Sequence, residues 1–310
     1  MNKGLGRLSV HNLTIDNDGN YIDSTTGAIK NDVAKKYSLM KFGSIKEIDE
    51  AAEEIYQKFL LNLTEYEPFF QKVKQGGQFI AIAAPGYRNV ESSSNTIIDK
   101  AVKKINVVLS LKNLPTIIVV KLPRLESNKA NYATLSADER NSLPPTTDQI
   151  LPGNEFFQFP IHFIFGDDVK ITGATARGAE KAVEKYGGLS FSEIYWISID
   201  HELTSKFPGI EDKINLHQVK IELNNDIEYI LNQPNFQPVQ RLIRLILSEK
   251  TRASLPTFLK KKVTDNCLTK LYISAHNNDY SKNELYQESV EILNKEMANR
   301  RLVTTEGFLI

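Results

Sequence analysis

Four short apolar runs in the first two thirds of the chain have the pattern of buried strands. Their hydrophobic residues are continuous rather than alternating, which is typical of strands that are covered on both faces of a parallel sheet. The runs are QFIAIAAP at 78–85, TIIVVKL at 116–122, IHFIFG at 161–166 and EIYWISI at 193–199. We therefore predict a strand at each of these positions.

Amphipathic segments lie before and between these runs. Ser44 and Glu47 form a capping box, and apolar residues then recur at helical spacing, which predicts a helix from about 45 to 63. The same spacing predicts helices within 92–111 and over Ala174–Tyr186. Strands that alternate with helices predict an α/β fold with an open, mostly parallel sheet flanked by helices. Ligands of such sheets bind outside the carboxyl ends of the strands.

The pattern changes at both ends of this region. Residues 1–40 are polar and rich in turn formers, which predicts an N-terminal flap or hairpin. Beyond about residue 215 only helical periodicity is found. We therefore predict an α/β domain at 41–214 and a helical C-terminal region, or appendage, at 215–310. The long polar stretch 124–153 has the character of a functional lid or a disordered loop.

Composition and charge exclude several classes of function. Lys and Arg together number 38, as do Asp and Glu, so the chain has no overall positive field for non-specific binding of nucleic acid or an anionic membrane. Cys267 is the single cysteine, which excludes an internal disulfide and favours a buried structural thiol. The N-terminus lacks the apolar core of a signal peptide, and no run approaches the roughly 18 apolar residues of a membrane span. A cytoplasmic location is expected.

The segment FIFGDDVKITGAT at 163–175 carries the clearest chemistry. Asp167 and Asp168 follow an apolar run, which would place two carboxylates at the carboxyl end of a strand. Gly173 permits a tight turn, and the amides at the start of the next helix would face an anion, with threonine hydroxyls as further donors. Paired acids beside such a phosphate cradle suit the vicinal hydroxyls of a sugar, either directly or through Mg²⁺.

Two other interpretations fit parts of this segment. Thr172 and Gly173 alone would fit an ordinary strand-to-helix turn with an N-cap. Two adjacent acids after an apolar strand would also fit a receiver domain, but receiver acids normally follow the first strand, whereas these follow the third predicted one. The complete segment is more specific than either part.

As a whole, FIFGDDVKITGAT resembles the phosphoribosyl diphosphate signature of type I phosphoribosyltransferases, in which hydrophobic residues lead to two acids and a TGxT turn. The resemblance implies that Asp167 and Asp168 address the ribose hydroxyls and Mg²⁺. It also implies that the 5-phosphate is wrapped by Ile171, Thr172, Gly173, Ala174 and Thr175. Several purine-using members carry an acid immediately before the TG pair, where this chain has Ile171. That departure argues against ordinary purine salvage.

A wider resemblance covers most of the chain. It is similar to the orphan phosphoribosyltransferases found with tellurium-resistance and related stress or conflict gene clusters. The segments that carry this resemblance are YSLMKFGS at 37–44, AAPGYRNVESSS at 83–94, KLPR at 121–124 and NYATLSADER at 131–140. In this family a helical tail is an expected part of the protein.

Three basic residues are secondary candidates for binding a diphosphate. Arg88 follows the first predicted strand, where type I enzymes carry their diphosphate-binding loop, and a guanidinium fork suits a phosphate. Lys121 and Arg124 end the second predicted strand and could meet the same group. Each of the three also fits a solvated surface charge.

Weaker candidates come from the long loop and the histidines. Tyr132, Ser136 and Arg140 could close over a substrate, or could serve only packing and solvation. His162 lies within a predicted strand, which favours a satisfied core histidine. His201 follows the last predicted strand and could contact a base. The histidines show no metal-ligand spacing.

These features predict a phosphoribosyltransferase-like enzyme of nucleotide metabolism. It would bind phosphoribosyl diphosphate, or a related ribose 5-phosphate compound, with Mg²⁺ as its cofactor. It would then transfer or release the ribose 5-phosphate group, with a base or nucleotide of unspecified identity as the other reactant. The alternatives are a non-catalytic ribose-phosphate or nucleotide sensor and an effector of a defence or stress system. The helical C-terminal region is a candidate surface for a second copy of the chain or for a partner protein.

Overall fold

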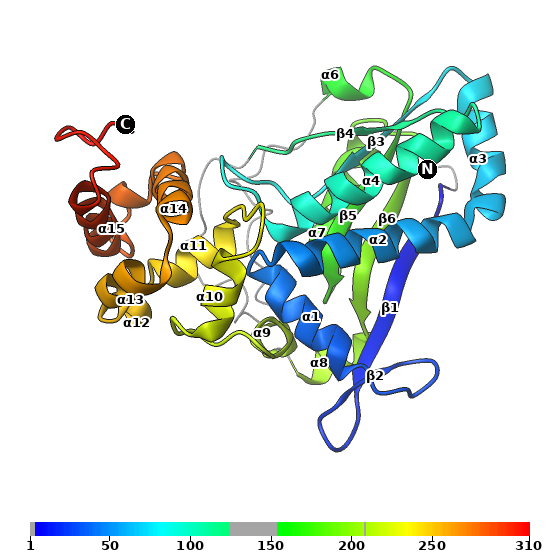
Figure 1. Cartoon of the computed structure of the whole chain (residues 1–310). Coiled ribbons are helices and arrows are strands. Elements are labelled where there is room, and N and C mark those ends of the chain that lie inside the picture. The colour runs from blue at the N-terminus through cyan, green and yellow to red at the C-terminus, as the bar shows by residue number, and fades with distance from the viewer. Residues whose placement is uncertain (1–3, 124–153, 208) are drawn as a thin grey trace. The chain divides into compact units, whose positions relative to one another are not determined.

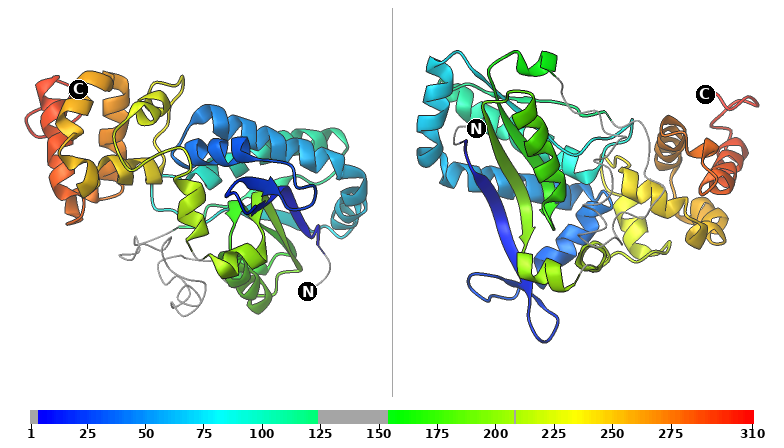
Figure 2. Two further views of the ribbon diagram at one scale, coloured as in Figure 1. Left: turned by 90° about the horizontal axis from the view of Figure 1, so that it is seen from below. Right: turned by 180° about the vertical axis from the view of Figure 1, so that it is seen from behind.

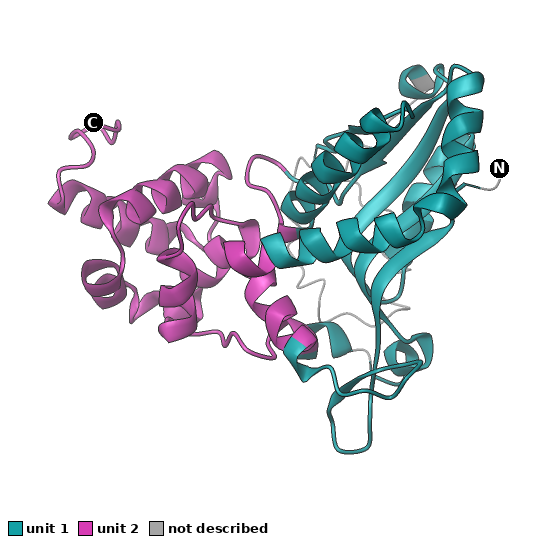
Figure 3. Cartoon of the chain, turned by 45° about the vertical axis from the view of Figure 1, so that its right-hand side comes forward, with its two compact units in different colours: residues 1–32, 49–87, 94–213 teal, residues 33–48, 88–93, 214–310 magenta. Residues whose placement is uncertain are grey.

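The computed structural model describes residues 4–123, 154–207 and 209–310, so the predicted loop at 124–153 lies outside the described residues. The chain divides into two compact units, coloured separately in Figure 3. Unit 1 comprises Met1–Asp32, Asp49–Tyr87 and Ser94–Lys213. Unit 2 comprises Val33–Ile48, Arg88–Ser93 and Ile214–Ile310. Each unit is therefore assembled from segments that are far apart in the sequence.

Unit 1 contains a six-stranded sheet with the order β2-β1-β6-β5-β3-β4. All neighbouring strands are parallel except β1 and β2, which are antiparallel. The strands are β1 (Arg7–Ile15), β2 (Tyr21–Asp23), β3 (Phe79–Ala83), β4 (Ile117–Val119), β5 (Ile161–Lys170) and β6 (Ser190–Ile199). The predicted open, mostly parallel α/β sheet is confirmed, because all four predicted strands lie in it.

Helices cover both faces of this sheet. In Figures 1 and 2, α2, α3 and α4 lie over one face and α7 lies over the other. Their bounds are α2 (Ile45–Leu61), α3 (Leu63–Gln75), α4 (Ser93–Leu111) and α7 (Ala174–Lys185), and unit 1 also contains the shorter helices α6 (Asn154–Phe157) and α8 (His201–Lys206). Apolar residues on both faces explain the continuous hydrophobic runs in β3 and β5.

The strand order reverses between β3 and β5. From β3 the chain passes through α4 to β4 on one side, and then returns to place β5 on the other side of β3. Such a reversal is the place where open α/β sheets bind ligands, outside the carboxyl ends of the strands. Ala83 is the last residue of β3, and it pairs with Phe165 of β5. The segments that leave β3 and β5 therefore both begin at this edge.

Strand β5 is longer than predicted. The sequence pattern ended it at Gly166, but it continues to Lys170 and includes both Asp167 and Asp168. Its pairing with β6 persists to the pair Lys170↔Ser198, whereas its pairing with β3 stops at Phe165. The extension was missed because the polar residues are stabilised by backbone bonds to β6, which hydrophobicity does not reveal.

The N-terminal segment contributes to the same sheet. Residues 16–20 form the turn that joins β1 to β2 in a hairpin. Strand β1 also pairs in parallel with β6, for example through Leu8↔Ile194 and Leu13↔Ile199. Leu8 and Leu13 are both buried. The sheet thus gains two strands that the four apolar runs did not indicate.

Unit 2 is helical. Its helices are α1 (Asn31–Lys41, entering from unit 1), α9 (Ile210–Asn215, also shared), α10 (Asn225–Leu231), α11 (Gln240–Ile246), α12 (Glu249–Arg252), α13 (Leu255–Lys262), α14 (Asp265–Asn277), η2 (Tyr280–Lys282) and α15 (Gln287–Asn299). The C-terminal helices predicted from the sequence are thus present. One hydrophobic core joins Leu39, Phe42 and Val90 to Leu242 and Leu268. Segments from before and after β3 therefore complete the core of the C-terminal helices.

Two details of unit 2 bear on the sequence predictions. The helical periodicity beyond residue 215 does not show the break between α13 and α14 at Val263 and Thr264. There the Thr264 hydroxyl accepts a hydrogen bond of 3.4 Å from the Cys267 amide. This N-cap starts α14 as a separate helix. Cys267 is buried, as expected of a structural thiol. Among the described residues of the whole chain, no helix has both the length and the apolar character needed to cross a membrane.

Candidate functional site

A three-residue turn connects β5 to α7 at the reversal of strand order. Gly173 has a φ of +70°, a left-handed conformation that side chains with a Cβ atom adopt only with strain. It occupies the N-cap position of α7 and provides no side chain to cap the helix. The first-turn amides of a helix lack intrahelical acceptors, and they carry the positive end of its dipole. This turn therefore leaves donors available for an anion, where an ordinary capped turn would satisfy them.

Thr172 only partly caps the helix. Its Oγ1 atom accepts a hydrogen bond of 3.3 Å from the Ala174 amide, which is long for this type of bond. Thr175 lies in the first turn of α7 and is exposed, while Ile171 is partly buried before the turn. The structure thus brings all five predicted cradle residues, 171–175, together at the start of one helix.

The two acids lie on opposite faces of β5. Asp167 shares its face of the strand with Phe165, which packs against α7, whereas Asp168 shares the other face with Gly166. A Cβ atom on Gly166 would lie 2.8 Å from Ile98 of α4, so that face is the one under α4. Asp168 is fully buried, Asp167 is partly exposed, and Asp167 Oδ1 accepts a 2.8 Å hydrogen bond from the Asp168 amide. Asp167 is therefore the more accessible of the two carboxylates.

This arrangement limits how Mg²⁺ could be held. Carboxylates on opposite faces of a strand do not chelate one ion together, and no cluster of three potential metal ligands is present among the described residues. Mg²⁺ commonly binds one or two carboxylates together with substrate phosphates and water. Asp167 fits that mode as a single protein ligand, with the remaining oxygens supplied by a bound ligand and by water.

A buried tyrosine lies next to Asp167. Tyr195 of β6 is the register partner of Asp167 and is 1% exposed. Burial is the main cause that raises the pKa of its phenol, and the negative charges of Glu193 and Asp167 raise that pKa further. Tyr195 is therefore a neutral donor close to the acids of the site.

Two basic side chains, Lys170 and Arg177, lie beside the turn. Arg177 Nη1 donates a 2.7 Å hydrogen bond to the Thr172 carbonyl oxygen. Lys170 is partly buried, and burial is the first cause that lowers the pKa of its ammonium group. The charge of Arg7 is the second, and Glu193 acts in the opposite direction. Arg7 and Glu193, which face each other on β1 and β6, form an ion pair. None of these four residues was predicted as a site residue from the sequence, although Lys170 lies within the 163–175 segment and Arg177 follows it closely.

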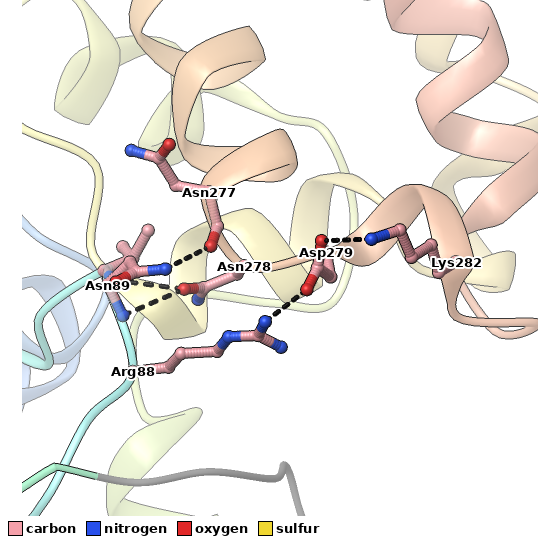
Figure 4. Close-up of polar contacts among 7 residues, drawn as sticks. Arg88, Asn89, Asn277, Asn278, Asp279 and Lys282 are labelled. Atoms are coloured by element: carbon pink, nitrogen blue, oxygen red, sulfur yellow. Dashed lines mark hydrogen bonds and ion pairs between the residues drawn. The ribbon is translucent and has the colours of Figure 1, made fainter.

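Arg88 lies in unit 2 and is held by that unit. Figure 4 shows its guanidinium paired with Asp279, which is also bound at 3.1 Å by Nζ of Lys282. The hydrogen bond from Lys282 is the largest cause that lowers the pKa of Asp279, and the charge of Arg88 adds to it. Next to it, Asn278 Oδ1 accepts hydrogen bonds from the amides of Asn89 and Val90, at 3.3 and 3.1 Å. The guanidinium of the predicted diphosphate ligand thus already has an anionic partner.

The other predicted residues are placed as follows. Lys121 is exposed, and its Nζ atom lies 4.4 Å from the centroid of the Tyr87 ring, a cation–π contact. The Tyr87 amide donates a hydrogen bond of 3.1 Å to the Leu122 carbonyl oxygen, which fixes this contact within unit 1. Arg124 lies outside the described residues, as do the three loop candidates Tyr132, Ser136 and Arg140.

The two histidines differ in their surroundings. His162 is buried, with Nδ1 2.7 Å from Ser190 Oγ and Nε2 2.9 Å from Gln78 Oε1. Burial is the first cause that lowers its pKa. The prediction of a satisfied core histidine is confirmed. His201 is exposed at the first position of α8, and its contact with a base stays a prediction.

Comparison with known proteins agrees with this geometry. The family model described as PRTase ComF-like matches residues 30–293, which include α1, every strand from β3 to β6 and most of unit 2. No curated protein and no solved structure matches the chain. The type I phosphoribosyltransferase-like family suggested by the FIFGDDVKITGAT segment is confirmed, and the chain belongs to the PRTase ComF-like family.

Proposed function

We propose that the protein binds phosphoribosyl diphosphate with Mg²⁺ and transfers or releases its ribose 5-phosphate group. The observation that carries this proposal is the turn at Gly173. It is left-handed, has a glycine with no capping side chain at the N-cap, and joins a strand with two acids to a helix at the reversal of strand order. Anions bind at uncapped helix starts of this kind, and sugar hydroxyls bind to carboxylates beside them.

Different residues of the site would bind different parts of the ligand. The amides and hydroxyls of 171–175 would anchor the 5-phosphate, and Asp167 would accept hydrogen bonds from the ribose hydroxyls. Asp168, buried on the α4 face, would support the strand end and reach the ligand less directly. Bound Mg²⁺ would supply positive charge to the diphosphate.

Displacement at the anomeric carbon passes through a cation-like state. The protein would therefore accelerate it by holding the ribose in position and by stabilising the negative charge of the departing diphosphate. Arg88 and Lys121 are proposed to assist that departure, and a diphosphate would compete with Asp279 for the Arg88 guanidinium. Ile171 provides no acid before the TG pair, which favours an acceptor other than the purines of salvage reactions.

Calorimetric titration of phosphoribosyl diphosphate, with and without Mg²⁺, tests the proposal. The double variant Asp167→Asn/Asp168→Asn is expected to lose the Mg²⁺-dependent part of binding, because it keeps the shape of the strand end and removes both charges. The control is Glu180→Gln/Glu184→Gln, which removes two charges from exposed positions of α7. Unchanged Mg²⁺-dependent binding in the Asp variant would refute the assignment.

A non-catalytic sensor is the second candidate function. It is favoured by Ile171, which provides no acid for a base or leaving group, and by the ion pair that occupies Arg88. Incubation with phosphoribosyl diphosphate, Mg²⁺ and a panel of bases separates the two functions. Release of diphosphate supports an enzyme, and tight binding without release supports a sensor.

A further inference from the structure

Two cationic side chains converge on the turn at Gly173. A Cβ atom at this glycine would lie 3.0 Å from Cε and 3.9 Å from Nζ of Lys170, and 3.3 Å from Nη1 of Arg177. The hydrogen bond from Arg177 to the Thr172 carbonyl oxygen holds the guanidinium at the turn. The two charges come from different elements, since Lys170 ends β5 and Arg177 lies in the first turn of α7.

Three described charges act on the ammonium group of Lys170. They belong to Arg7 on β1, Glu193 on β6 and Arg177 on α7. Because Arg7 and Glu193 are paired with each other, their charges offset, and Lys170 and Arg177 remain as two positive charges. Two like charges beside a partly buried turn repel each other, and an anion between them removes the repulsion.

We propose that Lys170 and Arg177 select the charge of the phosphate, so that the site takes a terminal phosphate monoester with two negative charges in preference to a phosphodiester with one. This inference rests on the proposed function and deepens it, because neither residue belongs to the TGAT turn. The turn can bind any phosphate through its amides, whereas two cations discriminate by charge. The ligand class is a ribose with a free 5-phosphate, and internal phosphates of nucleic acids or dinucleotides are disfavoured.

The probes are ribose 5-phosphate and its methyl ester at the phosphate, titrated into the full chain by calorimetry without Mg²⁺. The unsubstituted protein is expected to bind ribose 5-phosphate about tenfold or more tightly than the methyl ester, as follows from one added charge-assisted hydrogen bond. Lys170→Gln and Arg177→Gln are each expected to weaken binding of ribose 5-phosphate by about tenfold or more. Both substitutions should weaken binding of the methyl ester less, so that the ratio of the two affinities decreases.

Two further variants distinguish charge from folding. Lys170→Arg keeps the positive charge and is expected to keep the preference for the monoester. Lys181→Gln removes a charge from an exposed position later in α7 and is expected to change neither affinity. Thermal unfolding of each variant shows whether it folds, and a failure of Lys170→Gln to fold leaves Arg177→Gln as the decisive variant.

The inference is overturned if the unsubstituted protein binds both probes equally, if it binds neither, or if the preference survives in Lys170→Gln and Arg177→Gln. Titration of the unsubstituted protein with phosphoribosyl diphosphate and Mg²⁺ separates these results from failure of the proposed function. Binding of that ligand with no monoester preference would leave the proposed function in place and remove the role of the two cations. If none of the three ligands binds, both the proposed function and the role of the two cations are ruled out.

Discussion

The segments that leave β5 and β3 begin at the same edge of the sheet, but their stabilising contacts come from very different distances along the chain. The turn after β5 is organised mainly by its own neighbours, through the left-handed Gly173 and the hydrogen bond from Arg177 to Thr172. The segment Arg88–Ser93 after β3 belongs to unit 2, where Asn278 and Asp279 bind its backbone and side chains.

This difference explains why the contacts of one segment could be predicted from the sequence and those of the other could not. A turn with a required φ angle and local hydrogen bonds carries its constraints within a few residues, and these appear as a motif. Arg88 and its partner Asp279 are separated by 191 positions. The family resemblance and the fork geometry of the guanidinium suggested that Arg88 binds a diphosphate, whereas the fold pairs it with the Asp279 carboxylate.

The largest effect is expected at the turn after β5. Gly173→Val places a β-branched side chain at a φ of +70° and brings its Cβ atom to 3.0 Å from Lys170. The strain costs about 1 to 3 kcal/mol of stability, and phosphate binding should be lost because the turn and both cations move. Urea unfolding and titration of ribose 5-phosphate measure the two effects.

The matched control for this substitution is Gly178→Ala. Gly178 lies inside α7, and a Cβ atom there would meet no atom within 4 Å. A helical glycine replaced by alanine is expected to gain about 0.5 to 1 kcal/mol of stability and to keep phosphate binding. Equal binding losses in both glycine variants would contradict a special role for the turn.

A smaller effect is expected in the segment after β3. Asn278→Ala removes the oxygen that accepts hydrogen bonds from the Asn89 and Val90 amides, and Val90 is buried. Buried donors left without an acceptor cost about 1 to 3 kcal/mol, so unit 2 should be destabilised. Urea unfolding checks the loss, and faster hydrogen exchange at Val90 should accompany it.

Asn277→Ala is the control for this experiment. Asn277 is exposed, and it binds Asn89 through its backbone carbonyl oxygen, which the substitution retains. Stability and exchange should therefore remain close to those of the unsubstituted protein. A loss as large as that of Asn278→Ala would show that the position along α14, rather than the hydrogen bonds to Arg88–Ser93, determines the effect.

The smallest effect is expected from the ion pair itself. Asp279 has a φ of +53°, which asparagine tolerates, so Asp279→Asn removes the charge with little backbone strain. The folded-state pKa of Asp279 is lowered, so its contribution to stability is present above the unfolded pKa near 4 and is lost as the pH falls through the folded value. The variant should be slightly less stable than the unsubstituted protein at pH 7, with a difference that shrinks on acidification and in high salt.

Unfolding curves at pH 7 and at several pH values below 4, in low and high salt, measure this small difference. The same variant should bind phosphoribosyl diphosphate at least as well as the unsubstituted protein if Arg88 binds the diphosphate, because the competing carboxylate is gone. Weaker binding of phosphoribosyl diphosphate by Asp279→Asn would indicate that Asp279 orients the Arg88 guanidinium for the diphosphate and does not compete with it.

Much of the fold followed from hydrophobic periodicity. The runs 78–85, 116–122, 161–166 and 193–199 all became strands of one sheet, although Ile118 and Val119 of the edge strand β4 are exposed. Strand β1 was not identified as part of that sheet, because its pairing partner β6 lies far along the chain. The polar end of β5 was missed for a related reason, since its bonds to β6 are made by the backbone.

The sequence by itself determined the strand–turn–helix unit with its two acids, its left-handed glycine and its first-turn amides, because each of these depends on φ angles and hydrogen bonds between near neighbours. Only the tertiary structure decided that Asp168 is buried while Asp167 is accessible, and that Arg7 and Glu193 pair beside Lys170. It also decided that Arg88 meets Asp279. Burial and pairing depend on strand order and on packing between distant segments, and no local pattern of residues encodes either one.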